Sequence, residues 1–362
     1  MSGTSTRLRR ALVGLVWLLA GCVVRAEHPD DAPVVAPTVG LPQLEAWAWL
    51  APADDTAPDR WEPLDEAGVV ALTQLINLLL RAAPDGALAP ERRRQADALA
   101  AYVGVALREV TVAVEADGTP REIALWVVHE LADDRRGRGT YLIRRGPSSS
   151  GPVEILLEAP HSRYDRKTGA LALRLLIEVG VEAGVEAGGP RALFLNSAHR
   201  YRQRDGTRRR QLEPEGNPAD AAHNPDHPLA RVTAAALAER DLVVIQLHGF
   251  RPPAPTEGSP PEPSLIVSSG RRRPDRVSAR THAQLQRALP EQRCGHHGVD
   301  TVRLGALANV QGQAARLAGR CFVHVELDEP LRARLLEDAG LRRRFAAALF
   351  DGAREEARGG CP

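Results

Sequence analysis

The sequence predicts an α/β fold: a doubly wound, mostly parallel sheet flanked by helices, with an N-terminal helical preface and a small antiparallel meander. From Val153 onward, short and nearly continuous apolar runs alternate with stretches whose apolar residues recur at helical spacing. Strands that are apolar on both faces are expected where helices cover both sides of a parallel sheet. Before Val153, strand-like segments are separated only by turn signals, which indicates the meander.

The composition is that of an ordinary globular chain. Its 362 residues allow one large domain or two, and 43% hydrophobic with 26% charged residues exclude a wholly disordered chain and a multispanning membrane protein. The 47 basic and 46 acidic residues nearly cancel, which removes the electrostatic reason to expect nucleic-acid binding. All basic residues except Lys167 are arginine, so runs of arginine are weak signals.

The N-terminus has the pattern of an export signal. It carries Arg7, Arg9 and Arg10 with no acidic residue, and the apolar run that follows, residues 11–20, is too short to span a membrane. Leu19-Ala20-Gly21-Cys22 then resembles the end of a bacterial lipoprotein signal, whose cysteine is lipidated and becomes the first residue.

This resemblance implies a signal peptide over residues 1–21, a lipidated Cys22 and a tether over residues 22–45, which are rich in proline, alanine and aspartate. The protein would then be exported to the bacterial cell envelope and held on a membrane surface by its acyl chains. The alternative is a plain secretory signal in which the cysteine occurs by chance.

The helical preface and the meander are expected over residues 46–150. Apolar spacing predicts helices over 64–82 and 90–107. Turn signals at Asp117-Gly118 and within 133–139 separate the strand-like segments, which are 109–115, 122–130 and 140–145.

The α/β domain is expected over residues 151–358. Its apolar runs predict strands over 153–157, 192–195, 242–247, 265–267 and 322–327. Helical spacing predicts the covering helices over 169–183, 227–240, 301–318 and 330–356. The Pro- and Arg-rich stretches are expected to be loops, over 251–263 and 271–280. No glycine-rich phosphate loop follows a strand, so nothing supports a nucleotide cofactor.

An exported protein can form disulfides, and three cysteines follow Cys22. We expect Cys294 and Cys321 to pair because both flank the predicted helix over 301–318, although the sequence does not fix the pairing. The third is Cys361. None of them lies in a CxxC motif, so a zinc site made of thiolates is not expected.

Polar residues gather where the predicted strands end. Ligands of open α/β sheets bind beyond the carboxyl ends of the strands, so these residues are candidates for a functional site. Histidine follows three separate strands, as His161, His199 and His248. The last strand carries His324 and Glu326 on one face, because strand side chains alternate. Three strands that deliver histidines to one edge predict a shared site.

Such a site suits catalytic zinc. Zinc in enzymes typically takes three nitrogen or oxygen ligands and activates a water molecule, whose proton a nearby carboxylate accepts. His161 and Asp165, four residues apart in one loop, and His248 from a later strand would supply the ligands. Glu326 would be the general base. Because a four-residue gap in a loop has no fixed geometry, the prediction depends on the combination with His248.

A resemblance to known hydrolases rests on three motifs, which are Pro160-His161-Ser162-Arg163-Tyr164-Asp165, Gln246-Leu247-His248-Gly249 and Val323-His324-Val325-Glu326-Leu327. Over about residues 150–355, their order resembles that of zinc carboxypeptidases, N-formylglutamate amidohydrolases and N-acetylmuramoyl-L-alanine amidases, which share a phosphorylase/hydrolase-like sheet. The resemblance implies that His161, a carboxylate and His248 bind zinc, and that Glu326 catalyses the hydrolysis of an amide or peptide bond.

The chain departs from these families at the second ligand. Carboxypeptidases place a glutamate three residues after the first histidine, where this chain has Tyr164, and the amidases place theirs a helical turn or more further along. Asp165 is our candidate. Glu178, on the following helix, is the alternative that the amidase pattern gives.

Three further residues are candidates for binding substrate. His199 and Arg200 follow a strand, and an arginine fork can hold both oxygens of a carboxylate; a loop salt bridge is the alternative. His223 lies with Asp220 in a Pro- and Asn-rich loop that we expect to fold over the site. Its alternatives are a residue that orients a metal ligand and a solvated side chain.

The sequence thus predicts a membrane-anchored, zinc-dependent hydrolase of an amide or peptide bond. Its substrate would be peptidoglycan-derived material or an exported peptide, a class that follows from the predicted envelope location and the resemblance. The alternative is a non-catalytic envelope lipoprotein that binds a peptide or glycan on the same fold, and the irregular second ligand keeps this alternative open.

Overall fold

A computed structural model describes residues 36–48, 50, 60–116, 119–131, 135–146, 153–178, 189–208, 216–252, 262–357 and 361. The chain divides into two units, Met1–Ala36 and Pro37–Pro362, and all elements named below belong to the second. The predicted signal peptide, Cys22 and most of the predicted tether lie outside the described residues.

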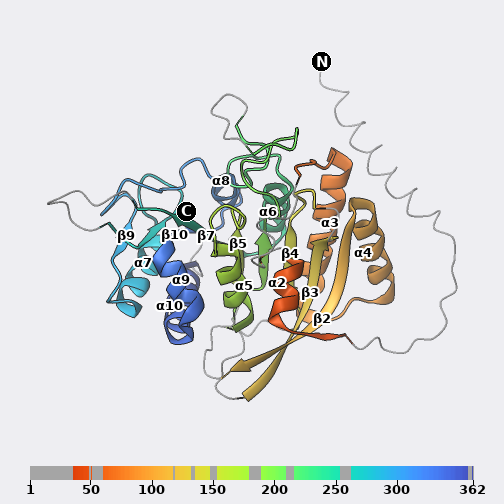
Figure 1. Cartoon of the computed structure of the whole chain (residues 1–362), viewed down its shortest axis with the longest axis horizontal. Coiled ribbons are helices and arrows are strands. Elements are labelled where there is room, and N and C mark those ends of the chain that lie inside the picture. Colours follow the sequence, from red (N-terminus) through yellow and green to blue (C-terminus); the bar gives the residue numbers. More distant parts are fainter. Residues whose placement is uncertain are drawn as a thin grey trace. The chain divides into compact units, whose positions relative to one another are not determined.

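The described residues form one ten-stranded sheet flanked by helices, which confirms the predicted α/β fold (Figure 1). The strand order is β1-β2-β3-β4-β6-β5-β7-β10-β8-β9. The neighbouring strands β6, β5, β7 and β10 are parallel, so their carboxyl ends meet at one edge. The strands are β1 (Thr38–Val39), β2 (Val105–Ala116), β3 (Thr119–Glu130), β4 (Thr140–Arg144), β5 (Glu154–Ala159), β6 (Ala192–Leu195), β7 (Leu242–Phe250), β8 (Leu265–Ser268), β9 (Cys294–His296) and β10 (Phe322–Asp328).

The predicted meander, β2 to β4, continues this sheet. β3 pairs antiparallel with both β2 and β4, and β4 pairs antiparallel with β6. Strands on both sides of the boundary expected at residue 150 therefore belong to the same sheet.

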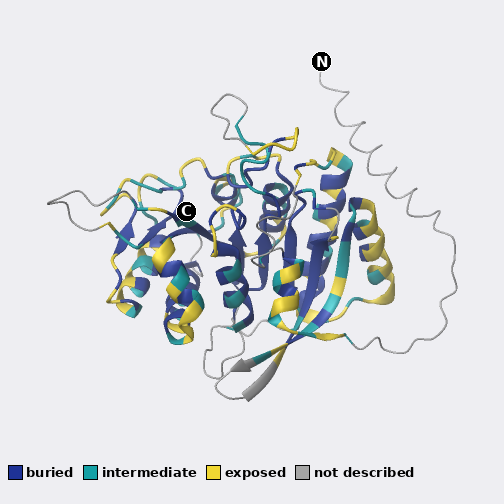
Figure 2. Ribbon diagram, in the orientation of Figure 1, coloured by how far each residue is buried: buried dark blue, intermediate teal, exposed yellow. Residues whose placement is uncertain are grey.

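Helices cover both faces of the sheet. One buried apolar cluster joins α5, α7, α9 and α10 to one face, and a second joins α3, α4, α6 and α8 to the other. Figure 2 shows the strands buried between these layers, with exposed residues on the helices. The helices are α2 (Leu41–Trp47), α3 (Glu66–Ala82), the 3-10 turn η2 (Ala83–Asp85), α4 (Pro90–Val103), α5 (Thr168–Glu178), α6 (Pro228–Glu239), α7 (Arg276–Ala288), α8 (Val310–Leu317), α9 (Glu329–Glu337) and α10 (Ala339–Ala357).

Helix α8 is shorter than predicted, because capping decides where it begins. The sequence predicts a helix over 301–318, but α8 starts at Val310, where the Asn309 side chain accepts a hydrogen bond from Gly312 N (2.9 Å). At the other end of the chain, α2 begins within the last residues of the predicted tether, with a proline in its first turn.

Two further differences also arise from aspartate caps. The helix predicted over 330–356 is two helices, α9 and α10, because Asp338 has extended backbone and its side chain accepts from Leu341 N (2.9 Å). The loop predicted over 271–280 ends early, since Asp275 caps the start of α7.

The predicted Cys294–Cys321 disulfide is wrong, because Cys321 bonds to Cys361. Cys294 lies on β9, and Cys321 directly precedes β10, two strands away. At roughly 4.8 Å per strand, this separation exceeds the reach of a disulfide. Cys294 is a buried thiol, and burial raises its pKa to about 12, so it stays protonated at neutral pH.

Residues Glu66–Asp85, which are α3 and η2, are long and apolar enough to cross a membrane by length and composition. However, 61% of the most apolar window is buried inside the fold, where α3 contacts α4 and α6. The apolar sequence of α3 is therefore explained by its burial as a core helix of the fold.

Candidate metal centre

The candidate site lies where the four parallel strands end. His161 follows β5, Arg200 lies in the segment after β6, and His248 and Glu326 lie near the ends of β7 and β10. His248 and Glu326 are partners in the register of these two strands, so their side chains leave the sheet side by side. The structure therefore brings the residues predicted from four strand ends to one edge.

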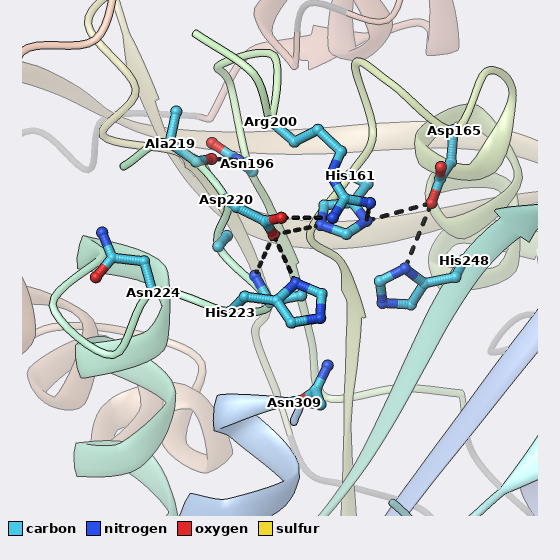
Figure 3. Close-up of polar contacts among 12 residues, drawn as sticks. His161, Asp165, Asn196, Arg200, Ala219, Asp220, His223, Asn224, His248 and Asn309 are labelled. Atoms are coloured by element: carbon cyan, nitrogen blue, oxygen red, sulfur yellow. Dashed lines mark hydrogen bonds and ion pairs between the residues drawn. The ribbon is translucent and has the colours of Figure 1, made fainter. Parts of the chain in front are cut away.

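His161, Asp165 and His248 converge at this edge (Figure 3). Asp165 Oδ2 lies 3.5 Å from His161 Nδ1 and 3.4 Å from His248 Nδ1. All three residues are buried, and one ligand atom from each lies within 4.8 Å of the others. Gly249 N also donates to Asp165 Oδ2 (3.1 Å), which holds the carboxylate in place.

The loop after β5 gives the four-residue gap between His161 and Asp165 its geometry. Asp165 N donates to His161 O (2.7 Å), as in one turn of an α-helix, and residues four apart on such a turn share a side. Thr168 Oγ1 then donates to Asp165 O (2.7 Å) at the start of α5. The turn thus points both side chains toward His248.

Both histidines point Nδ1 at Asp165. His161 Nε2 lies 2.7 Å from Asp220 Oδ1, and His248 Nε2 lies 2.9 Å from Gln246 Oε1. Because these oxygens accept hydrogen bonds, the neutral form of each ring carries its proton on Nε2 and keeps a lone pair on Nδ1. Arg200 Nη1, which can only donate, lies 3.3 Å from His161 Nδ1, in agreement with this assignment.

The donor set fits a zinc ion. The Nδ1 atoms of two imidazoles and one carboxylate oxygen face the same point, where neutral rings would offer their lone pairs to a cation. Zinc binds this combination of nitrogen and oxygen ligands. Histidines that bind a metal typically donate their other ring N–H to a carboxylate or carbonyl group, as both do here.

The charges around His161 favour a cation. Burial alone would lower the pKa of His161, but the carboxylates of Asp220 and Asp165 outweigh burial and raise it. The pKa values of both carboxyls lie well below their usual range, because interactions with the histidines overcome burial. Burial lowers the pKa of His248 to about 4, so His248 is neutral at pH 7 and available as a ligand.

Glu326 lies beside His248 and is almost fully buried. Its Oε2 has no hydrogen-bond partner among the described residues, and its Oε1 lies 3.6 Å from His324 Nε2. Burial, followed by repulsion from Asp165, raises the pKa of Glu326 to about 8. A carboxyl group with this pKa can both accept and release a proton near neutral pH.

Arg200 reaches the edge of the histidine pair. Its Nη2 donates to Asp220 Oδ2 (2.5 Å), and its guanidinium lies over the rings of Tyr164 and Tyr201, 5.3 and 5.2 Å from their centroids. Its buried Nε has no hydrogen-bond partner within the described part of the chain. His199 packs against Tyr164, with ring centroids 5.4 Å apart, and forms the outer wall of this group.

His223 lies on the other side of Asp220. Its Nδ1 lies 3.1 Å from Asp220 Oδ1, and 48% of its side chain is exposed. Glu178, by contrast, pairs with Arg342 (2.6 Å) on α10 and with Arg174 on its own helix, and it does not reach the histidines. Asp165 is therefore the carboxylate that faces them.

Glu158 and Gln246 are not predicted from the sequence to have a role in the site. Both are fully buried polar residues within strands that are otherwise almost wholly apolar, and Gln246 holds His248. A polar side chain inside a continuous apolar run is the signal that could have identified them. His324, expected on the same face as Glu326, does contact the site through the ring of His248 (4.7 Å between centroids).

No protein-family model matches the chain, and no curated protein sequence matches it. A metallo-carboxypeptidase from Burkholderia cenocepacia is 14% identical, with a TM-score of 0.38, over 82% of this chain and 70% of its own. A bacteriophage poly-gamma-glutamate hydrolase is 13% identical, with a TM-score of 0.32, over 58% of this chain and 86% of its own.

An N-acetylmuramoyl-L-alanine amidase from Clostridium difficile 630 is 9% identical, with a TM-score of 0.31, over 57% of this chain and 98% of its own. The solved structures that are similar to this chain therefore include carboxypeptidase and amidase folds. With TM-scores below 0.5, these likenesses say nothing about the chemistry of the site in this chain.

Proposed function

We propose that this chain is a zinc-dependent hydrolase that cleaves an amide or peptide bond. The observation that carries the proposal is the convergence of two Nδ1 atoms, from His161 and His248, on one oxygen of Asp165. Both histidines are locked in the required tautomer by their Nε2 contacts. Glu326, whose Oε2 has no hydrogen-bond partner among the described residues, lies beside His248.

The roles of the residues follow from this geometry. Zinc, when bound, would polarise a carbonyl group and lower the pKa of a water molecule. His161, Asp165 and His248 would hold it. Glu326 would accept the proton of the attacking water at Oε2 and return it to the leaving amine, a task that suits its raised pKa.

The substrate is proposed to carry a carboxylate close to the bond that is cleaved. The Arg200 side chain is 19% exposed and is held in place by Asp220 and two tyrosine rings. Such a guanidinium binds a carboxylate well. His199 and His223 flank it and are proposed to contact the rest of a peptide or a peptidoglycan-derived substrate.

Substitution of Glu326 by glutamine tests the enzyme directly. The full chain, purified in detergent and loaded with zinc, should hydrolyse members of a panel of peptides and peptidoglycan fragments. Glu326→Gln should keep its zinc and lose roughly 10²- to 10⁴-fold in turnover. Retained turnover would remove Glu326 from this role. Bound zinc without turnover of any panel member would favour the binding protein over the enzyme.

We also propose that lipidated Cys22 anchors the protein to a membrane of the bacterial cell envelope. The support is the basic, acid-free start of the sequence and Leu19-Ala20-Gly21-Cys22. Fractionation of cells that produce the wild type and Cys22→Ser tests this proposal. The variant should leave the membrane fraction, and a variant that stays there would contradict the anchor.

A further inference from the structure

A row of buried polar side chains crosses the sheet beneath the candidate metal centre. Glu158 on β5, Gln246 on β7 and His324 on β10 are neighbours in the register of these strands. Glu158 and Gln246 are fully buried, and the strand residues two positions before them belong to the apolar cluster. The row therefore interrupts a core layer that is otherwise apolar.

The hydrogen bonds in this row have one consistent direction. Gln246 Nε2 donates to Glu158 Oε2 (2.9 Å), and Gln246 Oε1 faces His248 Nε2 (2.9 Å). A flipped amide would set its NH₂ group against Asn309 Nδ2, a donor whose own orientation is fixed by the Gly312 N–H. Asn309 thereby fixes the orientation of the Gln246 amide, and the amide oxygen fixes which nitrogen carries the proton of a neutral His248.

Two helices hold the row in place from the same side of the sheet. Thr233 on α6 donates its hydroxyl to Glu158 Oε1. Asn309, the N-cap of α8, donates Nδ2 to Gln246 Oε1 (2.5 Å) and accepts from Gly312 N. Because a backbone N–H can only donate, the Asn309 amide also has a fixed orientation. Both polar atoms of the Gln246 side chain thus make hydrogen bonds.

Such a network costs free energy to bury, and an apolar layer can be as stable or more so. Gln246 contacts the candidate site at the His248 ring nitrogen that faces away from Asp165. We infer that Gln246, held by Glu158, is the positioning residue for His248: it aims the Nδ1 lone pair at the metal position. This inference rests on the proposed function, because it assigns His248 as a metal ligand.

Zinc affinity provides the first test. The full-length wild type, Gln246→Leu and Gln246→Glu are each titrated with zinc against a chromophoric chelator. Gln246→Leu keeps the size of the side chain and removes the acceptor, so zinc affinity should fall roughly 10- to 100-fold. Gln246→Glu should stay within about threefold of the wild type, because two adjacent buried carboxyls share a proton and still offer an oxygen to His248.

Gln292→Leu is the matched control. Gln292 is a buried glutamine that accepts from Ser264 Oγ (3.1 Å) and has no contact with the site in the described residues. The zinc affinity of Gln292→Leu should equal that of the wild type. Cobalt-loaded samples give a second readout, since the visible spectrum of Gln246→Leu should change and that of Gln292→Leu should not.

The outcomes separate the inference from the proposed function. A folded wild type that binds no zinc overturns both. If the wild type binds zinc and Gln246→Leu binds it equally well, the inference is overturned but the proposed function is not. If Gln246→Leu does not fold, ¹⁵N NMR of the wild-type histidines decides: a proton on His248 Nε2 supports the inference, and a proton on Nδ1 overturns it.

Discussion

The two candidate histidine ligands reach the same geometry by different means. His161 comes from a loop, and its Nε2 is held by a carboxylate, Asp220. His248 comes from within strand β7, and its Nε2 is held by a neutral amide, Gln246. Both present Nδ1 to the same oxygen of Asp165, at 3.5 and 3.4 Å.

The difference shows that a histidine can be oriented either by its position in a sheet or by a charged hydrogen-bond partner. The sheet register already sets the direction of His248, so a neutral acceptor is enough to choose its tautomer, and burial keeps its pKa at about 4. The loop that carries His161 has no such register. His161 is instead held by the carboxylate of Asp220. This carboxylate also raises the pKa of His161 and favours a positive charge on this side of the site.

The largest effect is expected from removing the carboxylate on the His161 side. Asp220→Ala should lower the free energy of unfolding by about 2–3 kcal/mol, because it removes a buried carboxylate that accepts from the partly buried Arg200 and faces His161. It should also weaken zinc binding roughly 10- to 100-fold, because His161 loses its acceptor. Urea denaturation and zinc competition measure the two effects.

Asp226→Ala is the control for this substitution, since Asp226 is an exposed aspartate of the same loop region. It should change stability by less than about 0.5 kcal/mol and leave zinc affinity unchanged. Equal effects of the two substitutions would show that Asp220 has no special role and would remove the difference between the two histidines.

On the His248 side, the buried Glu158 should make the stability of the protein depend on pH. Burial raises the pKa of Glu158 to about 7, whereas an unfolded glutamate titrates near 4.5. Between these values the unfolded chain releases a proton that the folded protein keeps, so stability falls as pH rises and levels off above pH 7. Glu158 should contribute a loss on the order of 3 kcal/mol across this window.

Glu158→Gln should remove this part of the pH dependence, because an amide does not titrate. Denaturation of both proteins at pH 4.5 and pH 8 measures it, and the difference between them isolates Glu158 from other groups. The variant should gain stability relative to the wild type at the higher pH. Parallel pH profiles would contradict a buried, protonated Glu158.

The smallest effect is expected at His223. About half of its side chain is exposed, and it is one of several groups that contact Asp220. His223→Gln should change zinc affinity by less than about threefold, because the position that it touches is not a ligand. A raised KM with unchanged zinc affinity would place it in substrate binding, and a large loss of zinc would instead make it part of the metal centre.

The sequence predicted much of the fold, because apolar runs and helical spacing are strong local signals. It predicted the neighbourhood of His161, Asp165 and His248 as well, because parallel strands must end at one edge. The lengths of α8, α9 and α10 could not be read in the same way. They depend on single capping side chains, such as Asn309 and Asp338, that also occur in loops.

The residues behind the ligands were harder to predict. Asp220 and His161 are 59 residues apart, and only the folded loop brings them to 2.7 Å. Glu158 and Gln246 are 88 residues apart and meet through strand pairing that the sequence does not specify. The predicted Cys294–Cys321 pairing was wrong for the same reason. The order of β10, β8 and β9 in the sheet decides which cysteines are close, and the sequence does not specify it.

Zinc content is the most direct test of the proposed metal centre. The full chain, purified in detergent, is equilibrated with zinc, dialysed and analysed by mass spectrometry for bound metal, beside a variant with both His161→Ala and His248→Ala. The wild type should retain about one zinc per chain, and the double variant should retain none. A folded wild type without zinc, or a double variant that keeps it, would contradict the assignment of these histidines.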